Sequence, residues 1–146
     1  MNSAYKTFIL IAALVFSFSF VGKEPPKDRQ IRFKNTKFNQ VAREARKTDK
    51  PIFAMVCASW CTNCNKMREK VFNDPQVAAF FNEHFVSTLV DAEDYKNNMR
   101  VTGWGVKSVP TLVFLTSDKR VIYLTSGFKD KDKMLQEGKN ALKLMR

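Results

Sequence analysis

The sequence has little of what several protein classes require. Its 146 residues correspond to about one domain, which excludes a multidomain enzyme. Three cysteines are too few to hold a small domain together by disulfides. The composition, with only 5 glycines, also excludes a collagen-like or coiled-coil rod. There is no internal repeat and no low-complexity tract. What is present fits a single globular domain, because 45% apolar residues and 13 Phe suffice for one packed core.

Positive charge is concentrated at the two ends of the chain. Lys and Arg number 25 against 14 Asp and Glu, which gives a net charge of +11. Residues 23–50 carry ten positive and four negative side chains, and residues 129–146 carry six and three. Residues 51–128, which contain the cysteines, carry eight and seven. The basic stretches have the pattern of solvated helix faces. We therefore expect no nucleic-acid binding, and a weak attraction to an anionic membrane surface or an acidic partner is favoured instead.

The N-terminus has the layout of an export signal. Lys6 precedes an uncharged apolar run from Thr7 to Val21, and a positive start before about 7–15 apolar residues is typical of secretory signals. The run is narrowly shorter than the ~20 residues that span a bilayer, so a marginal membrane anchor through the same run is the alternative. We expect residues 1–22 to be the export signal, residues 23–30 a polar linker and residues 31–146 the domain. The domain is then expected to work in the periplasm or another extracytoplasmic compartment.

Apolar periodicity predicts an α/β fold. Segments with helical spacing alternate with short β-rich runs in the order β-α-β-α-β-α-β-β-α. Strands joined by helices imply parallel pairing, and the last two strands form a hairpin that adds an antiparallel edge. We therefore expect a central mixed β-sheet flanked by helices. The strands are expected at residues 31–34, 52–58, 85–90, 111–116 and 120–125, and the helices at residues 38–49, 61–71, 75–81, 93–102 and from 130 onward.

Two cysteines lie at the predicted junction of a buried strand and a helix. Cys61 and Cys64 follow the apolar run that ends at Ala58. The first turn of a helix has unpaired N–H groups and partial positive charge, which favour a thiolate, so we expect Cys61 to be exposed and acidified. Cys64 lies one turn deeper on the same face, within reach of a disulfide to Cys61. This arrangement suits thiol–disulfide exchange, in which one thiolate attacks a substrate disulfide and the second resolves the mixed disulfide. A structural disulfide or two idle thiols is the alternative.

A second motif is Val109–Pro110–Thr111, immediately before a predicted strand. A cis proline there leaves a backbone edge next to the cysteines for an extended peptide. An ordinary trans proline that opens an edge strand is the alternative.

Together, these motifs resemble the thioredoxin superfamily over about residues 38–144. The resemblance is carried by Ala58–Ser59–Trp60–Cys61–Thr62–Asn63–Cys64 and by Ser108–Val109–Pro110–Thr111–Leu112–Val113–Phe114. Two further stretches are similar to bacterial thioredoxin-like proteins related to the periplasmic C-terminal domain of the thiol:disulfide interchange protein DsbD. They are Lys66–Met67 and Phe72–Asn73–Asp74–Pro75–Gln76–Val77.

The resemblance implies a single thioredoxin-like domain that acts as a thiol–disulfide oxidoreductase. It implies that Cys61 attacks, that Cys64 resolves and that the two form the redox disulfide. It also implies that Pro110 is the cis-proline and that Trp60, Val109 and Pro110 contact the substrate. The subfamily favours a monomeric reductase of protein disulfides that uses a membrane or soluble thiol electron donor, with no cofactor and no metal. Two other functions stay open. One is a redox-silent, chaperone-like peptide-binding module, which needs neither cysteine; the other is a disulfide isomerase, for which no dimerisation segment is evident.

Two positions depart from the thioredoxin pattern. Thioredoxins often have Gly-Pro between the cysteines, where this chain has Thr62–Asn63. This dipeptide tunes the reduction potential, so the direction of electron flow stays open. Thioredoxins also place a buried Asp six residues before the first cysteine to shuttle the proton of the resolving thiol, and that position is Met55 here. Glu69 is nearby in the sequence, but it is expected to face solvent.

The remaining candidate residues have plainer interpretations. Cys57 precedes Cys61 by four residues on the predicted strand. It is expected to be a small buried hydrophobe, and an accessory thiol that intercepts oxidised Cys64 is the alternative. A zinc site of the three cysteines and His84 has suitable ligand types, but a strand and a helical turn do not converge on one metal. We therefore expect His84 to be a helix-end residue. Asn65, directly after Cys64, excludes the c-type haem motif.

Overall fold

A five-stranded mixed β-sheet forms the centre of the protein. The computed structural model describes residues 29–145. The sheet order is β1-β3-β2-β4-β5. β1 and β2 both pair in parallel with β3, whereas β4 is antiparallel to β2 and β5 is antiparallel to β4. The predicted α/β class with a mixed sheet is confirmed. The strands are β1 (Phe33–Lys34), β2 (Ile52–Cys57), β3 (Val86–Asp91), β4 (Thr111–Leu115) and β5 (Val121–Ser126).

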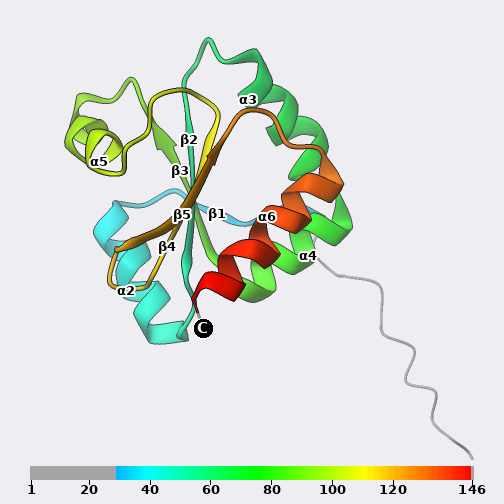
Figure 1. Cartoon of the computed structure of the whole chain (residues 1–146), viewed down its shortest axis with the longest axis horizontal. Helices are drawn as coiled ribbons and strands as arrows, with labels where there is room; N and C mark the ends of the chain where they lie inside the picture. The colour runs from blue at the N-terminus through cyan, green and yellow to red at the C-terminus, as the bar shows by residue number, and fades with distance from the viewer. Residues whose placement is uncertain (1–28, 146) are drawn as a thin grey trace, which may run out of the picture.

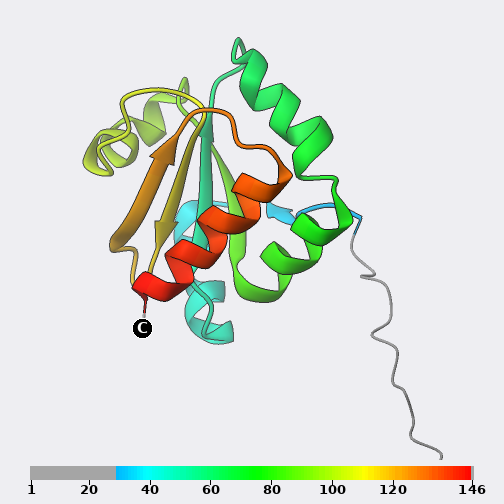
Figure 2. The ribbon, with the colours of Figure 1, turned by 45° about the vertical axis from the view of Figure 1, so that its right-hand side comes forward.

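Helices cover both faces of the sheet (Figure 1). One face carries α3 (Thr62–Lys66), α4 (Pro75–His84) and α6 (Lys131–Leu144), and the other carries α2 (Phe38–Thr48) and α5 (Asn98–Gly103). A π-helical turn, η1 (Met67–Val71), continues α3, and a 3₁₀ turn, η2 (Tyr95–Asn97), precedes α5. Figure 2 shows α6 lying across the sheet beside α4.

Strand β2 is buried on both of its faces, as its continuous apolar run predicts. All residues from Ile52 to Val56 have no accessible surface. On one face, the Phe53 ring lies 4.8 Å from the ring of Phe81 and 5.3 Å from that of Phe114. On the other face, β2 packs against the apolar side of α2. The strand that leads to Cys61 is therefore fixed by packing from both sides.

One strand runs against the expected direction. A helix between β3 and β4 predicts that β4 pairs in parallel, but β4 is antiparallel to its neighbour β2. The reason is the short helix within the connection, since α5 has 6 residues and rises by only about 9 Å. The chain therefore stays at the end of the sheet where β3 stops and re-enters from that end. The single helix expected at residues 93–102 is correspondingly split into η2 and α5.

The predicted export signal, residues 1–22, and most of the predicted linker lie outside the described residues. Within residues 29–145, no helix combines the length and the apolar character needed to cross a bilayer.

Gly138 marks a close approach between α6 and α4. A Cβ atom at this position would lie 2.6 Å from Cε1 of Phe80 and 3.0 Å from Cζ of Phe81. Alanine normally stabilises a helix interior relative to glycine by about 1 kcal/mol. Here the added methyl group overlaps the packed rings of Phe80 and Phe81, so alanine is expected to destabilise the protein instead of stabilising it.

We expect Gly138→Ala to lower the free energy of unfolding by about 1–3 kcal/mol, which is the usual cost of overpacking a core. Gly103→Ala is the matched control, because no atom lies within 4 Å of a Cβ there. The control should leave the free energy of unfolding unchanged or slightly higher. Urea denaturation followed by circular dichroism measures both variants. A Gly138→Ala protein at least as stable as the wild type would contradict this packing.

Candidate active site

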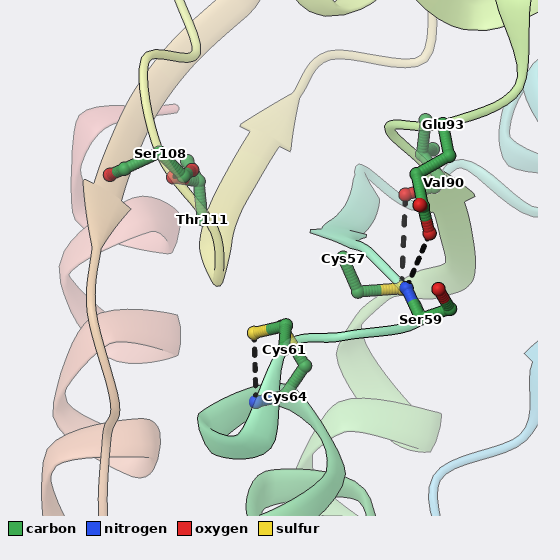
Figure 3. Close-up of a disulfide and its surroundings, with 8 residues drawn as sticks. All are labelled: Cys57, Ser59, Cys61, Cys64, Val90, Glu93, Ser108 and Thr111. Atoms are coloured by element: carbon green, nitrogen blue, oxygen red, sulfur yellow. Dashed lines mark hydrogen bonds between the residues drawn. A yellow bond between two sulfur atoms is a disulfide. The ribbon is translucent and has the colours of Figure 1, made fainter.

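Cys61 and Cys64 form a disulfide at the start of α3 (Figure 3), with their Cα atoms 5.2 Å apart. Cys61 is the N-cap residue of α3 and has an extended backbone. Its Sγ accepts a hydrogen bond from the backbone N–H of Cys64, with a distance of 3.1 Å between S and N. The predicted position of the pair at a strand–helix junction is confirmed. The sulfur of Cys61 thus takes the place of a capping oxygen, where N–H donors and the helix dipole favour negative charge.

Cys61 is buried, not exposed as predicted. Only 4% of Cys61 is accessible, compared with 1% of Cys64. The physical reason is the disulfide, which turns the Cys61 sulfur inward to Cys64. Both residues join a hydrophobic cluster that also contains Met55 and Leu112.

The position of the buried acid in thioredoxins is apolar in this protein. Met55 has no accessible surface and lies in the same cluster as the cysteine pair. Glu69, on η1, is exposed, as expected from its position five residues past Cys64. Neither position therefore offers a buried carboxyl group to the resolving thiol.

The peptide bond between Val109 and Pro110 is cis, so the cis alternative is confirmed. Pro110 is buried, and Val109 packs against the cluster that contains the disulfide. The Thr111 hydroxyl donates to the carbonyl oxygen of Ser108 at 2.6 Å and lies 2.7 Å from the Ser126 hydroxyl. These contacts hold the turn before β4 in place against the site.

Trp60, directly before Cys61, is 72% exposed. Within residues 29–145 it is one of only four large apolar side chains that are exposed, and two of the others, Tyr95 and Met99, lie on η2 and α5. The position of Trp60 directly before Cys61 leaves the indole accessible to a molecule that approaches the cysteine pair.

Cys57 ends β2 and is half-buried, whereas the sequence predicts a buried position. At this residue the strand leaves the sheet, so the packing that covers its earlier residues is incomplete. Figure 3 shows its side chain directed toward β3, where Sγ lies 3.8 Å from the carbonyl oxygen of Val90. Burial raises the pKa of the Cys57 thiol, Arg68 lowers it, and the charge of Asp91 raises it further.

Sequence reasoning missed one contact at the site. The backbone N–H of Ser59 donates to the Glu93 carboxylate at 2.6 Å (Figure 3). Cys57 pairs with Asp91 in the parallel ladder, so the loops after β2 and β3 leave the sheet side by side. The hydrogen bond from Ser59 holds the pKa of Glu93 below its ordinary value. The acids at the end of β3 and directly after it, which are Asp91, Glu93 and Asp94, are the signal that could have found this contact.

Other candidate sites lie away from the cysteine pair. An open groove of about 720 Å³ is lined by residues of β1, β3, α3 and η1, including Phe33, Arg68 and Leu89, and neither Cys61 nor Cys64 lines it. In the part of the chain that the structure describes, no three His, Cys, Asp or Glu side chains are gathered to hold a metal. His84 is the last residue of α4, as expected.

A family model described as "Thioredox_DsbH: Protein of unknown function, DUF255" matches residues 33–145. The chain belongs to this family. A Bacteroides thetaiotaomicron protein described as a disulphide-isomerase has a solution structure that is 30% identical, with a TM-score of 0.71, over 80% of this chain and 96% of that chain. A thioredoxin from Thermus thermophilus is 18% identical, with a TM-score of 0.68, over 77% of this chain and 88% of that chain. The thioredoxin fold is therefore confirmed.

The resemblance to DsbD is also confirmed. The thiol:disulfide interchange protein DsbD of Campylobacter jejuni is 28% identical over 102 residues, which are 68% of this chain and 18% of DsbD. The chain spans between 6% and 18% of the length of the curated relatives that it matches first. In fold, family and cysteine pair, this Thioredox_DsbH member is a thioredoxin-like protein with a Cys61–Cys64 disulfide.

Cys57 provides a test of the electrostatics at the end of β2. It is the free thiol of the oxidised protein, and its pKa lies above the ordinary value of 9.0. Its alkylation by iodoacetamide should therefore be slow at pH 7 and still accelerate above pH 9. Arg68→Gln removes a cation that lowers the pKa and should slow alkylation at a fixed pH. Asp91→Asn removes an anion that raises the pKa and should accelerate it.

Alkylation of the oxidised full chain, followed by intact mass against pH, measures these rates. The two variants should move the rate in opposite directions. A shift in the same direction in both would contradict the placement of Cys57 between these charges.

Proposed function

We propose that this protein is an extracytoplasmic thiol–disulfide oxidoreductase that reduces protein disulfides through Cys61 and Cys64. The observation that carries the proposal is the Cys61–Cys64 disulfide at the N-cap of α3, next to the cis-Pro110 turn. A redox-silent peptide-binding module would need neither cysteine.

In the proposed cycle, the Cys61 thiolate attacks one sulfur of a substrate disulfide. A bond forms between Cys61 and that sulfur, the substrate S–S bond breaks, and the other substrate sulfur leaves as a thiolate. Cys64 loses its proton and attacks the Cys61 sulfur, which forms the internal disulfide and releases the second substrate thiolate. With protons taken up by both thiolates, the substrate has gained two electrons and two protons, and the cysteine pair has lost them. A dithiol donor then reduces the pair again.

The geometry supports these roles. A backbone N–H that is 3.1 Å from the Cys61 sulfur favours its charged form. Trp60 is exposed directly before Cys61. We assign Trp60, Val109 and Pro110 to substrate binding, because an exposed indole and a fixed turn near the pair can hold the peptide around the substrate cysteine.

The direction of electron flow rests on similarity. The match to DsbD favours a reductase whose partners are protein disulfides and a membrane or soluble thiol donor. The similar Bacteroides protein described as a disulphide-isomerase favours a second candidate, a disulfide isomerase. The reduction potential of the pair separates the two.

We expect the full chain, equilibrated in glutathione buffers of graded potential, to show one transition of two thiols that maps to Cys61 and Cys64. A reductase should have its midpoint near that of thioredoxin, at about −270 mV, whereas an isomerase should lie near about −180 mV. Samples are quenched with acid, alkylated and counted for free thiols by mass. Cys57 should stay free throughout, and its loss together with the pair would identify it as the accessory thiol.

The controls are Cys61→Ser and Cys64→Ser. Cys64→Ser should accumulate a mixed disulfide with an oxidised substrate, because the resolving step is missing, and Cys61→Ser should accumulate none. If all three wild-type thiols stay free at every potential, the oxidoreductase proposal is wrong.

The extracytoplasmic location rests on the predicted export signal in residues 1–22. We expect the full chain, expressed in a Gram-negative bacterium, to be recovered from the periplasm with a mass that lacks about 22 residues. Full mass in the membrane fraction would support the anchor alternative. Full mass in the cytoplasm would contradict the proposed location.

A further inference from the structure

We propose that Glu93 is a positioning residue for thiol–disulfide exchange, which it supports by holding the Ser59–Trp60 loop in the orientation that presents Cys61. The inference rests on the proposed function, because it concerns how Cys61 and Trp60 are placed for a substrate. Glu93 touches neither sulfur in the contacts described above and is therefore not a catalytic residue.

The loop between β2 and Cys61 depends on few contacts. It contains only Ala58, Ser59 and Trp60, of which the last two are exposed. The backbone N–H of Cys61 donates to the carbonyl oxygen of Ala58 at 3.1 Å, which closes a turn. The second restraint is the 2.6 Å hydrogen bond from Ser59 N–H to Glu93. Because exposed residues gain little from packing, these hydrogen bonds define the path of the loop.

Glu93 itself lies on a loop whose backbone is restrained by hydrogen bonds. Its backbone N–H donates to Oδ1 of Asp91 at 2.8 Å, and the Asn97 side chain donates to the carbonyl oxygen of Asp91 at 2.9 Å. The N–H of Ala92 donates to the carbonyl oxygen of Cys57 at 2.8 Å, which extends the β2–β3 ladder by one bond. The carboxylate therefore reaches Ser59 from a loop whose backbone is already fixed to β2.

The charge of Glu93 strengthens this contact. A carboxylate accepts a hydrogen bond from an N–H about twice as strongly as a neutral acceptor does. The same hydrogen bond holds the pKa of Glu93 below its ordinary value of 4.5, so the charged acceptor is present at neutral pH. Protonation of Glu93 removes that charge and weakens the restraint on Ser59.

Three substitutions at Glu93 separate the effect of its side-chain length from the effect of its charge. Glu93→Ala removes the acceptor, Glu93→Asp keeps the charge but shortens the side chain by one methylene, and Glu93→Gln keeps an oxygen at the same reach. The matched control is Glu83→Ala, which removes an exposed carboxylate from α4. The rate of exchange is measured for the reduced full chain with a fluorescent peptide that contains one disulfide.

We expect Glu93→Ala and Glu93→Asp to lower this rate about 5-fold or more, as for the loss of a charge-assisted hydrogen bond. Glu93→Gln should restore the rate to within about twofold of the wild type, because a neutral hydrogen bond is retained. Glu83→Ala should leave the rate unchanged. Rescue by the Gln variant separates a positioning role from a general loss of stability.

A spectroscopic readout does not depend on exchange. In a Trp104→Phe background, Trp60 is the remaining tryptophan. Its emission in the oxidised full chain should change as the pH falls below 4.5, the ordinary pKa of the carboxyl group, because protonation of Glu93 weakens the hydrogen bond from Ser59. The titration should be absent in Glu93→Ala and in Glu93→Gln.

The outcomes distinguish this inference from the proposed function. If the wild type exchanges thiols and Glu93→Ala does so equally fast, the positioning role is wrong and the proposed function stands. If the wild type exchanges nothing, the proposed function is wrong. Independently of that result, an emission titration that is the same in Glu93→Ala as in the wild type would show that Glu93 does not order the loop.

Discussion

The parallel pairing of β2 with β3 determines where the chemistry of this protein is placed. The ladder runs without a break from Ile52 opposite Val86 to Cys57 opposite Asp91. Both strands therefore end at the same edge of the sheet, where β2 continues to the cysteine pair and β3 to the loop that contains Glu93 and Asp94. β4 begins at this edge because it runs in the opposite direction, and it brings the cis-Pro110 turn with it. The two ladders of β2 thus gather three separate segments of the chain.

The core keeps this edge rigid. The Phe53 ring is surrounded by the rings of five other residues, and it lies on the face of the sheet that also carries the cysteine pair. Removing such a side chain from a closely packed interior is costly, because the surrounding rings relax only in part. The site therefore combines a rigid, closely packed core beneath it with an exposed loop, and hydrogen bonds have to order that loop.

The sequence was sufficient for the features that are encoded locally. The apolar run of β2, the cysteine spacing and the proline before β4 lie within short windows, so the junction at Cys61, the disulfide to Cys64 and the cis bond could be predicted from pattern and family resemblance. Features that depend on the path of the chain could not. The direction of β4 follows from the shortness of helix α5, and the Ser59–Glu93 contact follows from which strands are neighbours. The burial of Cys61 depends on the packing of the oxidised pair against the cluster that contains Met55 and Leu112, and a local stretch of sequence does not show that packing.

The amide of Cys64 has a consequence for release as well as for capture. In any mixed disulfide formed at this site, one sulfur belongs to Cys61 and the other to the partner molecule. An N–H positioned as in the oxidised protein, 3.1 Å from the Cys61 sulfur, stabilises the charge that develops when Cys61 departs. A sulfur that carries charge easily is also the better leaving group. The same amide therefore also favours the reverse step, in which a released substrate thiolate attacks the mixed disulfide and Cys61 departs, so attachment of the partner stays reversible until Cys64 completes the exchange.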